Sequence, residues 1–334
     1  MSQDILVVGP SWVGDMVMAQ ALFMRLRQRH PQAAIDVLAP GWSLPILARM
    51  PEVRAGIELP LGHGDFGFGE RRRIGHGLRS KKYAQAIVLP GSWKSALTPY
   101  FARIPRRTGY RREFRYGLLN DLRTLDKTIL PTTVQQFLAL AEEGAVNQAP
   151  STPQPRLRAE PQRIEALRQQ FGLDPHKPAV ALMPGAEYGP AKRWPPEYFA
   201  ELSGRLVAAG YQVWMLGSAK EKELGAAIAQ GRADIHDLSG RTQLADVVDL
   251  LAAAGAAVSN DSGLMHVAAA VGTRLVAIYG SSSPKMTPPL SQLAQVLYLG
   301  LYCSPCFQRT CPLGHLNCLR QISVDQVLAA LKLK

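Results

Sequence analysis

The amino-acid sequence predicts an α/β protein of two doubly wound domains, each with a largely parallel sheet that carries helices on both faces. The first reason is size, because 334 residues exceed one ordinary α/β core and suggest two domains of roughly 150 residues each. The second is that short apolar runs alternate with helical segments in both halves of the chain. The third is a proline-rich segment between the two halves.

The first half begins with a strand, a helix and a second strand. Residues 4–9 (DILVVG) and 34–40 (AIDVLAP) are short apolar runs flanked by turn residues, which is typical of buried strands. Between them, Met16 to Arg29 has the apolar spacing of a helix, and Pro31 is expected to end it. Residues 84–92 (AQAIVLPGS) form another predicted strand.

The boundary between the halves is predicted from composition. The segment from Asn147 to Gln162 has four prolines in sixteen residues and little apolar content, which is typical of a linker. We therefore expect an N-terminal domain over residues 1–155 and a C-terminal domain over residues 156–320. Residues 321–334 are expected to form a closing helix, since Ser323 and Gln326 have the spacing of a capping box.

The second half repeats the alternation. Strands are predicted within residues 178–186, 211–218, 255–263 and 274–284, and helices within 196–209 and 244–253. Each predicted strand ends in a cluster of Gly, Ser, Asn or Asp. Ligands of doubly wound sheets bind beyond the carboxyl ends of the strands, so these polar ends are the candidate binding loops. We expect the two domains to face each other across a cleft.

The net charge of +12 is concentrated in one segment. Residues 71–115 contain 13 Lys and Arg against one acid, Glu113, so this segment carries +12 and the rest of the chain balances to zero. Such a block attracts an anionic partner, and nucleic acid, a phosphorylated glycolipid and an anionic membrane leaflet all fit; the simpler interpretation is a solvated surface. A nucleic-acid-binding protein is disfavoured, because the chain shows no helix-turn-helix or zinc-finger pattern and the segment has few aromatic residues beyond Trp93, Tyr100, Phe101, Tyr110 and Phe114.

The sequence predicts a cytoplasmic protein. Its longest apolar runs, such as Leu250 to Val258, fall well short of the roughly 20 residues that span a bilayer. The N-terminus has an acidic residue before a short strand-like run and lacks the features of a signal peptide.

Four cysteines lie within sixteen residues: Cys303, Cys306, Cys311 and Cys318. Disulfides are not expected in a cytoplasmic chain. The first pair has the Cys-x2-Cys spacing of half a zinc site, but the second pair is six apart rather than two to four. We therefore favour reduced structural thiols over bound zinc.

The first candidate site follows the first strand. Gly9 and Gly14 have the Gly-x4-Gly spacing of a phosphate-binding loop, but the next residue is Asp15 where a P-loop has lysine. A carboxylate there repels a polyphosphate, so we expect this loop to have a function other than binding one.

The second candidate site combines three loops of the C-terminal half. In NDSGLMH, the turn through Asp261, Ser262 and Gly263 leads into a helix whose N-terminus suits a diphosphate, and His266 lies in its first turn. The alternative is that Asp261 and Ser262 are ordinary N-cap residues. The loop after the strand within 178–186 contains Glu187, Lys192 and Arg193, and the loop after the next strand contains Gly217, Ser218 and Glu221. Lys192 can neutralise phosphate charge. The alternative is that the Lys-Arg pair faces solvent.

Three long motifs, GPSWVGDMVM, PGAEYGPAKRWP and NDSGLMHVAAA, occur in this order along the chain. Together they closely resemble the ADP-heptose:lipopolysaccharide heptosyltransferases of glycosyltransferase family 9. The stretches LGHGDFGFGERRRIGHGLR and RYGLLNDLRTLDK are similar to that family too, so the resemblance covers nearly the whole chain. The cysteine cluster departs from the family pattern and is not expected to take part in the chemistry.

The resemblance implies a fold, an activity and partners. The fold is a GT-B type, with the final helix crossing back onto the N-terminal domain. The activity is inverting, metal-independent transfer of L-glycero-D-manno-heptose from ADP-heptose to the first heptose of heptosyl-Kdo2-lipid A, releasing ADP. No cofactor is required, the partners are ADP-heptose and the lipopolysaccharide inner-core glycolipid, and a monomer in peripheral contact with the cytoplasmic face of the inner membrane is expected.

The resemblance also implies roles for particular residues. Asp15 is the expected general base, because a base must take the proton of the attacking hydroxyl, and Lys192 is expected to stabilise the leaving diphosphate. Donor-binding residues are expected at Ser11, Gly14, Glu187, Lys192, Ser218, Glu221, Asp261, Ser262, Gly263, Leu264 and His266. The anionic acceptor is expected to contact Arg71, Arg72, Arg73, Arg106, Arg107, Arg111 and Arg112.

Two other enzyme classes are alternatives. A related transferase with another donor nucleotide or acceptor is the runner-up, because Gly217 to Glu221 specifies the base and ribose only weakly. A dinucleotide-dependent oxidoreductase is disfavoured, because no predicted strand is followed by Gly-x-Gly-x-x-Gly.

Overall fold

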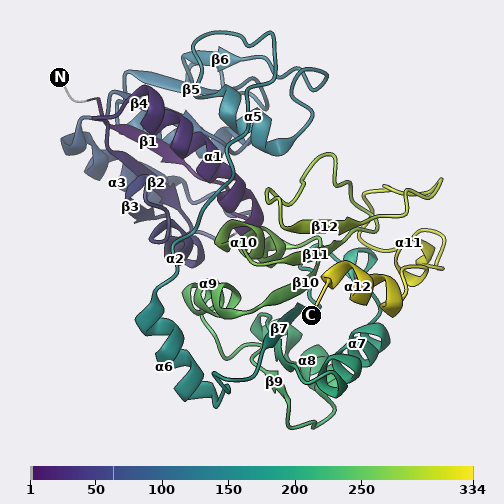
Figure 1. The fold of residues 1–334 in the computed structure, drawn as a ribbon. Helices are drawn as coiled ribbons and strands as arrows, with labels where there is room; N and C mark the ends of the chain where they lie inside the picture. The colour runs from purple at the N-terminus through teal and green to yellow at the C-terminus, as the bar shows by residue number, and fades with distance from the viewer. Residues whose placement is uncertain (1–2, 63, 334) are drawn as a thin grey trace. The chain divides into compact units, whose positions relative to one another are not determined.

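The computed structural model describes residues 3–62 and 64–333 and divides into two compact units, Met1–Pro155 and Arg156–Lys334 (Figure 1). Both units are α/β, and each has its own six-stranded sheet in which all the strand pairs are parallel. The predicted fold class is thereby confirmed. The predicted cleft between the two domains stays a prediction.

The sheet of the N-terminal unit has the order β3-β2-β1-β4-β5-β6. Parallel neighbours need crossover connections, and here helices lie in each of them except the one from β5 to β6. The strands are β1 (Ile5–Val8), β2 (Ile35–Ala39), β3 (Val53–Glu58), β4 (Gln85–Val88), β5 (Arg106–Tyr110) and β6 (Asp121–Arg123). The helices are α1 (Val13–Arg29), η1 (Gly41–Ser43), α2 (Leu44–Leu47), α3 (Phe68–Leu78), η2 (Arg79–Lys81), η3 (Trp93–Ala96), α4 (Leu97–Phe101) and α5 (Thr133–Ala139).

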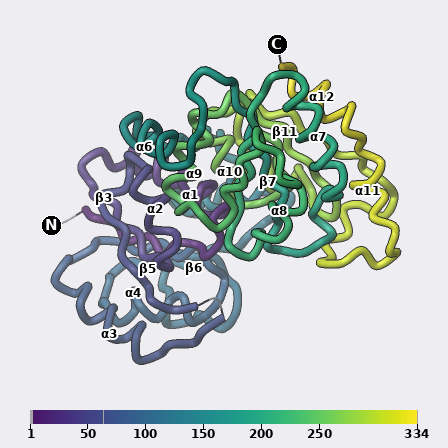
Figure 2. Tube along the Cα trace, turned by 90° about the horizontal axis from the view of Figure 1, so that it is seen from below, coloured from purple at the N-terminus to yellow at the C-terminus, as the bar shows by residue number. Residues whose placement is uncertain are grey.

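The core of this unit lies on both faces of the central strands. All four residues of β1 are buried, and Leu6 and Val8 pack with Val88 of β4 on one face. Helix α1 packs against α5. Helix α3 packs against α4 (Figure 2). Strands buried on both faces read as continuous apolar runs, which explains why β1, β2 and β4 were predicted correctly.

The sheet of the C-terminal unit has the order β12-β11-β10-β7-β8-β9. Counted from its own first strand, this is the same 3-2-1-4-5-6 order as in the N-terminal unit. The strands are β7 (Ala179–Met183), β8 (Gln212–Met215), β9 (Ile235–Asp237), β10 (Ala256–Asn260), β11 (Leu275–Ile278) and β12 (Ala294–Leu297). The helices are α6 (Pro161–Phe171), η4 (Pro190–Lys192), α7 (Pro196–Ala208), η5 (Ala219–Glu221), α8 (Lys222–Ala229), α9 (Leu244–Ala253), α10 (Gly263–Val271), α11 (Asn317–Arg320) and α12 (Val324–Leu331).

The last helix belongs to the C-terminal unit. α12 packs against α7 and against β10, β11 and β12, and its Val327 and Leu331 are fully buried in the core of that unit. The predicted capping box is confirmed, because Ser323 Oγ accepts from Gln326 N and Gln326 Oε1 accepts from Ser323 N. The expected return of residues 321–334 to the N-terminal domain stays a prediction.

The predicted linker is too long at its C-terminal end. Leu157 N donates to Ala270 O and Glu160 N donates to an Asp249 carboxylate oxygen, so the chain is already attached to the C-terminal unit there. Pro161, which counted as a linker proline, is the first residue of α6, a position where the fixed φ of proline suits a helix.

A second correction concerns Gly-x-Gly-x-x-Gly. Gly62, Gly64 and Gly67 have this spacing and lie between β3, a strand that the sequence did not predict, and α3. The dinucleotide fingerprint follows the first, central strand of a doubly wound sheet. Because β3 is an edge strand, this loop lies away from that position, and the disfavoured oxidoreductase gains no support from it.

Within residues 3–62 and 64–333, no helix combines the length and apolar character needed to cross a membrane.

Candidate active site

In the C-terminal unit, the site is built where the strand order reverses. The chain runs from β7 to β8 and β9 on one side, then returns to place β10 next to β7. The loops after β7 and β10 therefore leave the sheet in opposite directions and open a crevice at its carboxyl edge, where ligands of such sheets bind. Lys192 lies in the first of these loops and Asp261 in the second.

Lys192 and Asp261 meet in this crevice. Lys192 Nζ lies 2.5 Å from Asp261 Oδ2, and Ser282 Oγ, from the loop after β11, donates to the same carboxylate oxygen at 2.5 Å. The Asp261 side chain is 5% exposed and that of Lys192 19%. A buried carboxylate is tolerated when it is paired and hydrogen-bonded. Asp261 thus holds a cation at the edge of the sheet.

The N-terminus of α10 is open toward this crevice. Ser262 occupies the N-cap position with extended backbone, yet within the described residues its side chain makes no capping hydrogen bond. The first N–H groups of a helix have no partner within the helix and carry partial positive charge. Ser262 therefore does not cap α10 through its side chain, and diphosphate binding by the first amides of the helix stays a prediction.

His266 lies in the first turns of α10 and is 5% exposed. Burial lowers the pKa of His266 to about 4; the Asp261 carboxylate opposes this shift and Lys192 adds to it. The imidazole is therefore neutral at pH 7, and it can donate one hydrogen bond without adding charge.

Glu221 joins the loops after β7 and β8. Its Oε2 accepts from Ser218 N at 2.6 Å, which closes the turn that starts α8. The carboxylate packs against two glycines. A Cβ added at Gly185 would lie 1.5 Å from Oε1, and a Cβ added at Gly217 would lie 2.9 Å from Oε2. Glu187 is more exposed and pairs with Lys220.

The loop that carries Lys192 is anchored by residues that sequence analysis missed. Trp194 N donates to Asn260 Oδ1 at 2.9 Å, and the buried indole donates from Nε1 to Ile322 O at 2.8 Å. Lys192 Nζ lies 5.1 Å from the centre of the Tyr188 ring, an attractive cation–π geometry. The position of Trp194 directly after the Lys-Arg pair is the sequence feature that could have indicated its anchoring role. No sequence pattern indicated that Ser282 is a hydrogen-bond partner of Asp261.

The cysteine-containing segment supports the same loop. Ala191 N donates to Arg309 O, and Tyr188 Oη donates to Phe307 O at 2.6 Å. Gly189 lies against this segment, since a Cβ there would be 2.6 Å from Arg309 O.

The four cysteines are free thiols, and burial raises the pKa of Cys318 to about 11. The part of the chain that the structure describes holds no group of three or more His, Cys, Asp or Glu side chains arranged for a metal.

The N-terminal unit has an equivalent switch point between β1 and β4. Ser11 lies in the loop after β1, and Gly14 and Asp15 lie in the first turn of α1. Asp15 is half-buried and makes interactions within the protein. A carboxylate therefore occupies the carboxyl edge of this sheet, whereas the same edge of the C-terminal unit carries a lysine.

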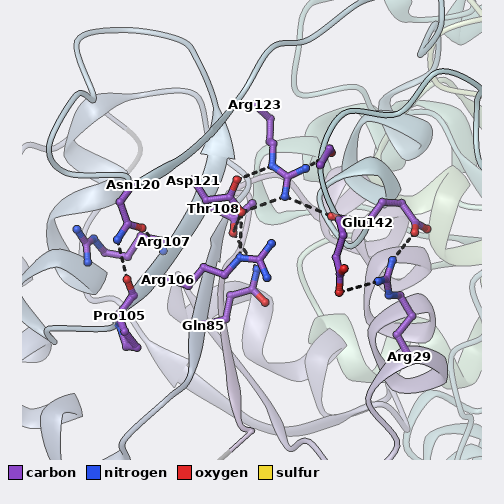
Figure 3. A network of polar contacts seen from close by, with 12 residues as sticks. Arg29, Gln85, Pro105, Arg106, Arg107, Thr108, Asn120, Asp121, Arg123 and Glu142 are labelled. Carbon is purple, nitrogen blue, oxygen red and sulfur yellow. Dashed lines mark hydrogen bonds and ion pairs between the residues drawn. The ribbon is translucent and has the colours of Figure 1, made fainter.

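The arginines predicted to bind the acceptor fall into different environments. Arg71 is 6% exposed and donates to Phe66 O, and Arg73 pairs with Glu70. Arg106 and Arg107 lie at the amino end of β5, roughly 13 Å from its carboxyl end at about 3.3 Å per residue. There Arg106 donates to Asp121, and Arg107 donates to Ile104 O and Leu118 O; Figure 3 shows the network around Asp121.

The other acceptor candidates are better placed for a ligand. Arg111 and Arg112 follow the carboxyl end of β5, on the same edge as Asp15, and both are exposed. Arg111 donates to Tyr116 Oη and lies over its ring. Arg72 is exposed in the first turns of α3. Of the predicted set, Arg72, Arg111 and Arg112 are thus exposed, whereas Arg73 and Arg106 are also exposed but are paired with Glu70 and Asp121.

The fold and site together define a doubly wound, two-unit protein of GT-B type, with a Lys–Asp ion pair at the switch point of its second sheet. The family description glycosyltransferase family 9 (heptosyltransferase) matches residues 71–317. Lipopolysaccharide heptosyltransferase 2 of Escherichia coli strain K12 is 52% identical over 305 residues, which cover 88% of each chain. Lipooligosaccharide heptosyltransferase 2 of Haemophilus influenzae is 48% identical over 308 residues, 89% of this chain and 88% of that one.

A solved structure, that of E. coli ADP-heptose lps heptosyltransferase II, superposes with a TM-score of 0.88 at 47% identity and covers 98% of this chain and 97% of its own. The chain belongs to glycosyltransferase family 9, the heptosyltransferases. The resemblance predicted from the motifs is thereby confirmed.

Proposed function

We propose that this protein transfers L-glycero-D-manno-heptose from ADP-heptose to the first heptose of heptosyl-Kdo2-lipid A, with inversion at the transferred sugar and release of ADP. The observation that carries this proposal is the Lys192–Asp261–Ser282 cluster beside the open N-terminus of α10, in a chain of glycosyltransferase family 9. The similarity to heptosyltransferase 2 proteins favours this acceptor.

The donor diphosphate is proposed to bind between Lys192 and the first amides of α10. Lys192 is held by Asp261 and lies close to that helix start, so it can neutralise phosphate charge where a metal does so in other enzymes. Backbone N–H groups of Ser262, Gly263 and Leu264 would bind the phosphate oxygens. His266 would donate to the donor as a neutral imidazole, and Ser218, Glu221 and Glu187 would contact the nucleoside.

Asp15 is proposed as the general base. It removes the proton from the attacking acceptor hydroxyl while that oxygen bonds to the anomeric carbon and the bond to the diphosphate breaks on the opposite face. The leaving ADP takes the electron pair, and Lys192 and the α10 amides stabilise its charge. No metal is needed in this scheme, because the chain itself supplies the positive charge. Ser11 and Gly14 remain proposed donor contacts.

The acceptor is proposed to bind the N-terminal unit. Its Kdo carboxylates and phosphates would contact the exposed Arg72, Arg111 and Arg112. The basic segment 71–115 would also rest on the anionic cytoplasmic face of the inner membrane, where the acceptor is anchored, with the enzyme acting as a monomer.

The test is transfer from ADP-heptose to a purified one-heptose acceptor. Asp15→Asn is expected to lower kcat about 10²- to 10⁴-fold, because it removes the base, with the KM for ADP-heptose nearly unchanged. Lys192→Ala is expected to lower kcat and raise that KM. Asp126→Asn is the matched control, since Asp126 is exposed and an amide can keep its turn contacts with Thr128. Full activity of Asp15→Asn would contradict the proposed base.

The donor nucleotide is tested by thermal unfolding with ADP, UDP, NAD and single-stranded DNA. ADP alone is expected to raise Tm, and the shift should grow with its concentration by mass action. A larger shift with UDP would indicate the related transferase with another donor.

A further inference from the structure

We propose that Trp12, Trp42 and Trp93 form a stacking platform for the pyranose rings of the acceptor saccharide on the N-terminal unit. The identity of that saccharide rests on the proposed function; the platform rests on the placement of the three indoles.

The three tryptophans follow three neighbouring strands at nearly the same distance. Val8 of β1 is paired in register with Leu38 of β2 on one side and Val88 of β4 on the other. Trp12 and Trp42 lie four residues beyond Val8 and Leu38, and Trp93 lies five beyond Val88. Because adjacent strands are about 4.8 Å apart, the three loops start side by side at one edge of the sheet. That edge includes the switch point, where ligands bind.

All three indoles are exposed. Trp12 is 45% exposed, Trp42 47% and Trp93 40%, whereas Trp194 and Trp214, in the C-terminal unit, are buried. Tryptophan is highly buried on average, and exposed aromatic clusters mark binding surfaces. The core of the unit therefore does not account for these three residues.

The platform is held in place by its surroundings. Trp42 Nε1 donates to Ser11 O at 3.0 Å, which ties the loop after β2 to the loop after β1. Trp93 N donates to Glu113 Oε2 at 2.9 Å, and its ring centre lies 5.1 Å from that of Phe66. Trp12 is the N-cap residue of α1, three positions before Asp15. A ring stacked on Trp12 would thus lie close to the proposed base.

The chemistry of the edge suits a saccharide. The face of an indole carries negative quadrupole charge and attracts the polarised C–H groups on the apolar face of a sugar ring. Carboxylates lie at the same edge: Asp15, Glu113 and Glu58, whose Oε1 is 2.7 Å from where a Cβ of Gly41 would be. These groups can accept hydrogen bonds from sugar hydroxyls.

Anionic groups of the same saccharide find cations next to the platform. The aliphatic part of Arg112 packs over Gly91, two residues before Trp93. Arg112 and its neighbour Arg111 are both exposed. The platform and these arginines thus suit a saccharide that presents both neutral sugar faces and carboxylates or phosphates.

The experiment measures binding of the deacylated one-heptose inner-core saccharide to the full chain by calorimetry. Trp12→Leu, Trp42→Leu and Trp93→Leu are each expected to raise Kd about 3- to 10-fold, the range of one lost aromatic contact. Trp93→Phe should recover part of the affinity, because it restores an aromatic face. Tyr302→Leu, which removes an exposed aromatic ring from the C-terminal unit, should leave Kd unchanged. Thermal unfolding of each variant checks that it folds.

The outcomes separate the alternatives. Unchanged Kd in all three tryptophan variants, or failure of the wild type to bind the saccharide, would overturn the platform. Loss of retention on phosphatidylglycerol vesicles with unchanged saccharide Kd would also overturn it, and would assign the indoles to the membrane instead. A protein that binds the saccharide through the tryptophans but transfers no heptose would keep the platform and reject the proposed function.

Discussion

His266 combines a titratable ring with an interior position in the candidate donor site. Its side chain is buried beside Asp261 and Lys192, and burial lowers its pKa from an ordinary value of 6.5 to about 4. In the unfolded chain the ring gains a proton once the pH falls below about 6.5. The folded protein binds fewer protons than the unfolded chain in this range, so stability decreases as the pH falls from 6.5 toward 4.

This gives a pH-dependent prediction. The free energy of unfolding of the wild type should fall between pH 6.5 and 4 by up to about 3 kcal/mol more than that of His266→Asn, which cannot titrate. Urea unfolding at several pH values measures the difference, and other titrating groups cancel between the two proteins. His176→Asn, at an exposed position, is the control and should follow the wild type. Parallel curves for wild type and His266→Asn would contradict the buried, neutral histidine.

At the scale of single residues, the sequence identified the chemically important side chains, but it did not identify which of them contact each other. Lys192 and Asp261 were both picked out from strand-end loops, but their pairing depends on β7 and β10 being neighbours, which needs the topology. Arg71 shows that the sequence also does not separate buried from exposed arginines. It belongs to a run of three arginines, and only the packing of α3 shows that it is buried and binds backbone carbonyls while Arg72 faces outward.

At the scale of elements, predictability follows position in the sheet. The sequence identified β1, β2 and β4 of the first sheet and β7, β8, β10 and β11 of the second. It missed all four edge strands, β3, β6, β9 and β12. An edge strand is covered less completely, so it needs no continuous apolar run; β3, for example, is exposed at Arg54, Ala55 and Gly56. β5 was missed because it begins with two arginines.

The cap of α12 is a testable element. Ser323→Ala is expected to lower the free energy of unfolding by about 1 kcal/mol, because it removes the oxygen that accepts from Gln326 N. Ser323→Gly should cost only a few tenths of a kcal/mol, since glycine is tolerated at the N-cap. Chemical unfolding of the three proteins gives both values. If Ser323→Ala matched the wild type, the capping box would have no role in holding α12 on the core.

At the scale of the whole molecule, each unit has a core of its own. Among the residues that the structure describes, the hydrophobic core cluster of the C-terminal unit contains buried side chains from Val180 to Leu331 and none from before Arg156. A unit with its own core can fold alone. The Lys192–Asp261–Ser282 cluster and α10 lie entirely within it.

We therefore predict that residues 156–334 fold cooperatively without the rest of the chain and bind ADP. At an ADP concentration 100 times Kd, Tm should rise by about 5–10 °C, which corresponds to about 2.7 kcal/mol of ligand stabilisation. Differential scanning fluorimetry measures the shift, and the same fragment with Lys192→Ala should show a smaller one. A folded fragment that ADP does not stabilise would mean that Ser11 or Gly14 of the N-terminal unit is needed for the nucleotide.

The support of the Lys192 loop by the end of the chain has a consequence for synthesis on the ribosome. The second sheet is complete once β12 has emerged at Leu297, but Arg309 O, Phe307 O and Ile322 O, which fix residues 188–194, come later. A nascent chain that has just finished its last strand has all the residues proposed to bind the nucleotide and none of these three anchors. The site reaches its final form only when translation is nearly over.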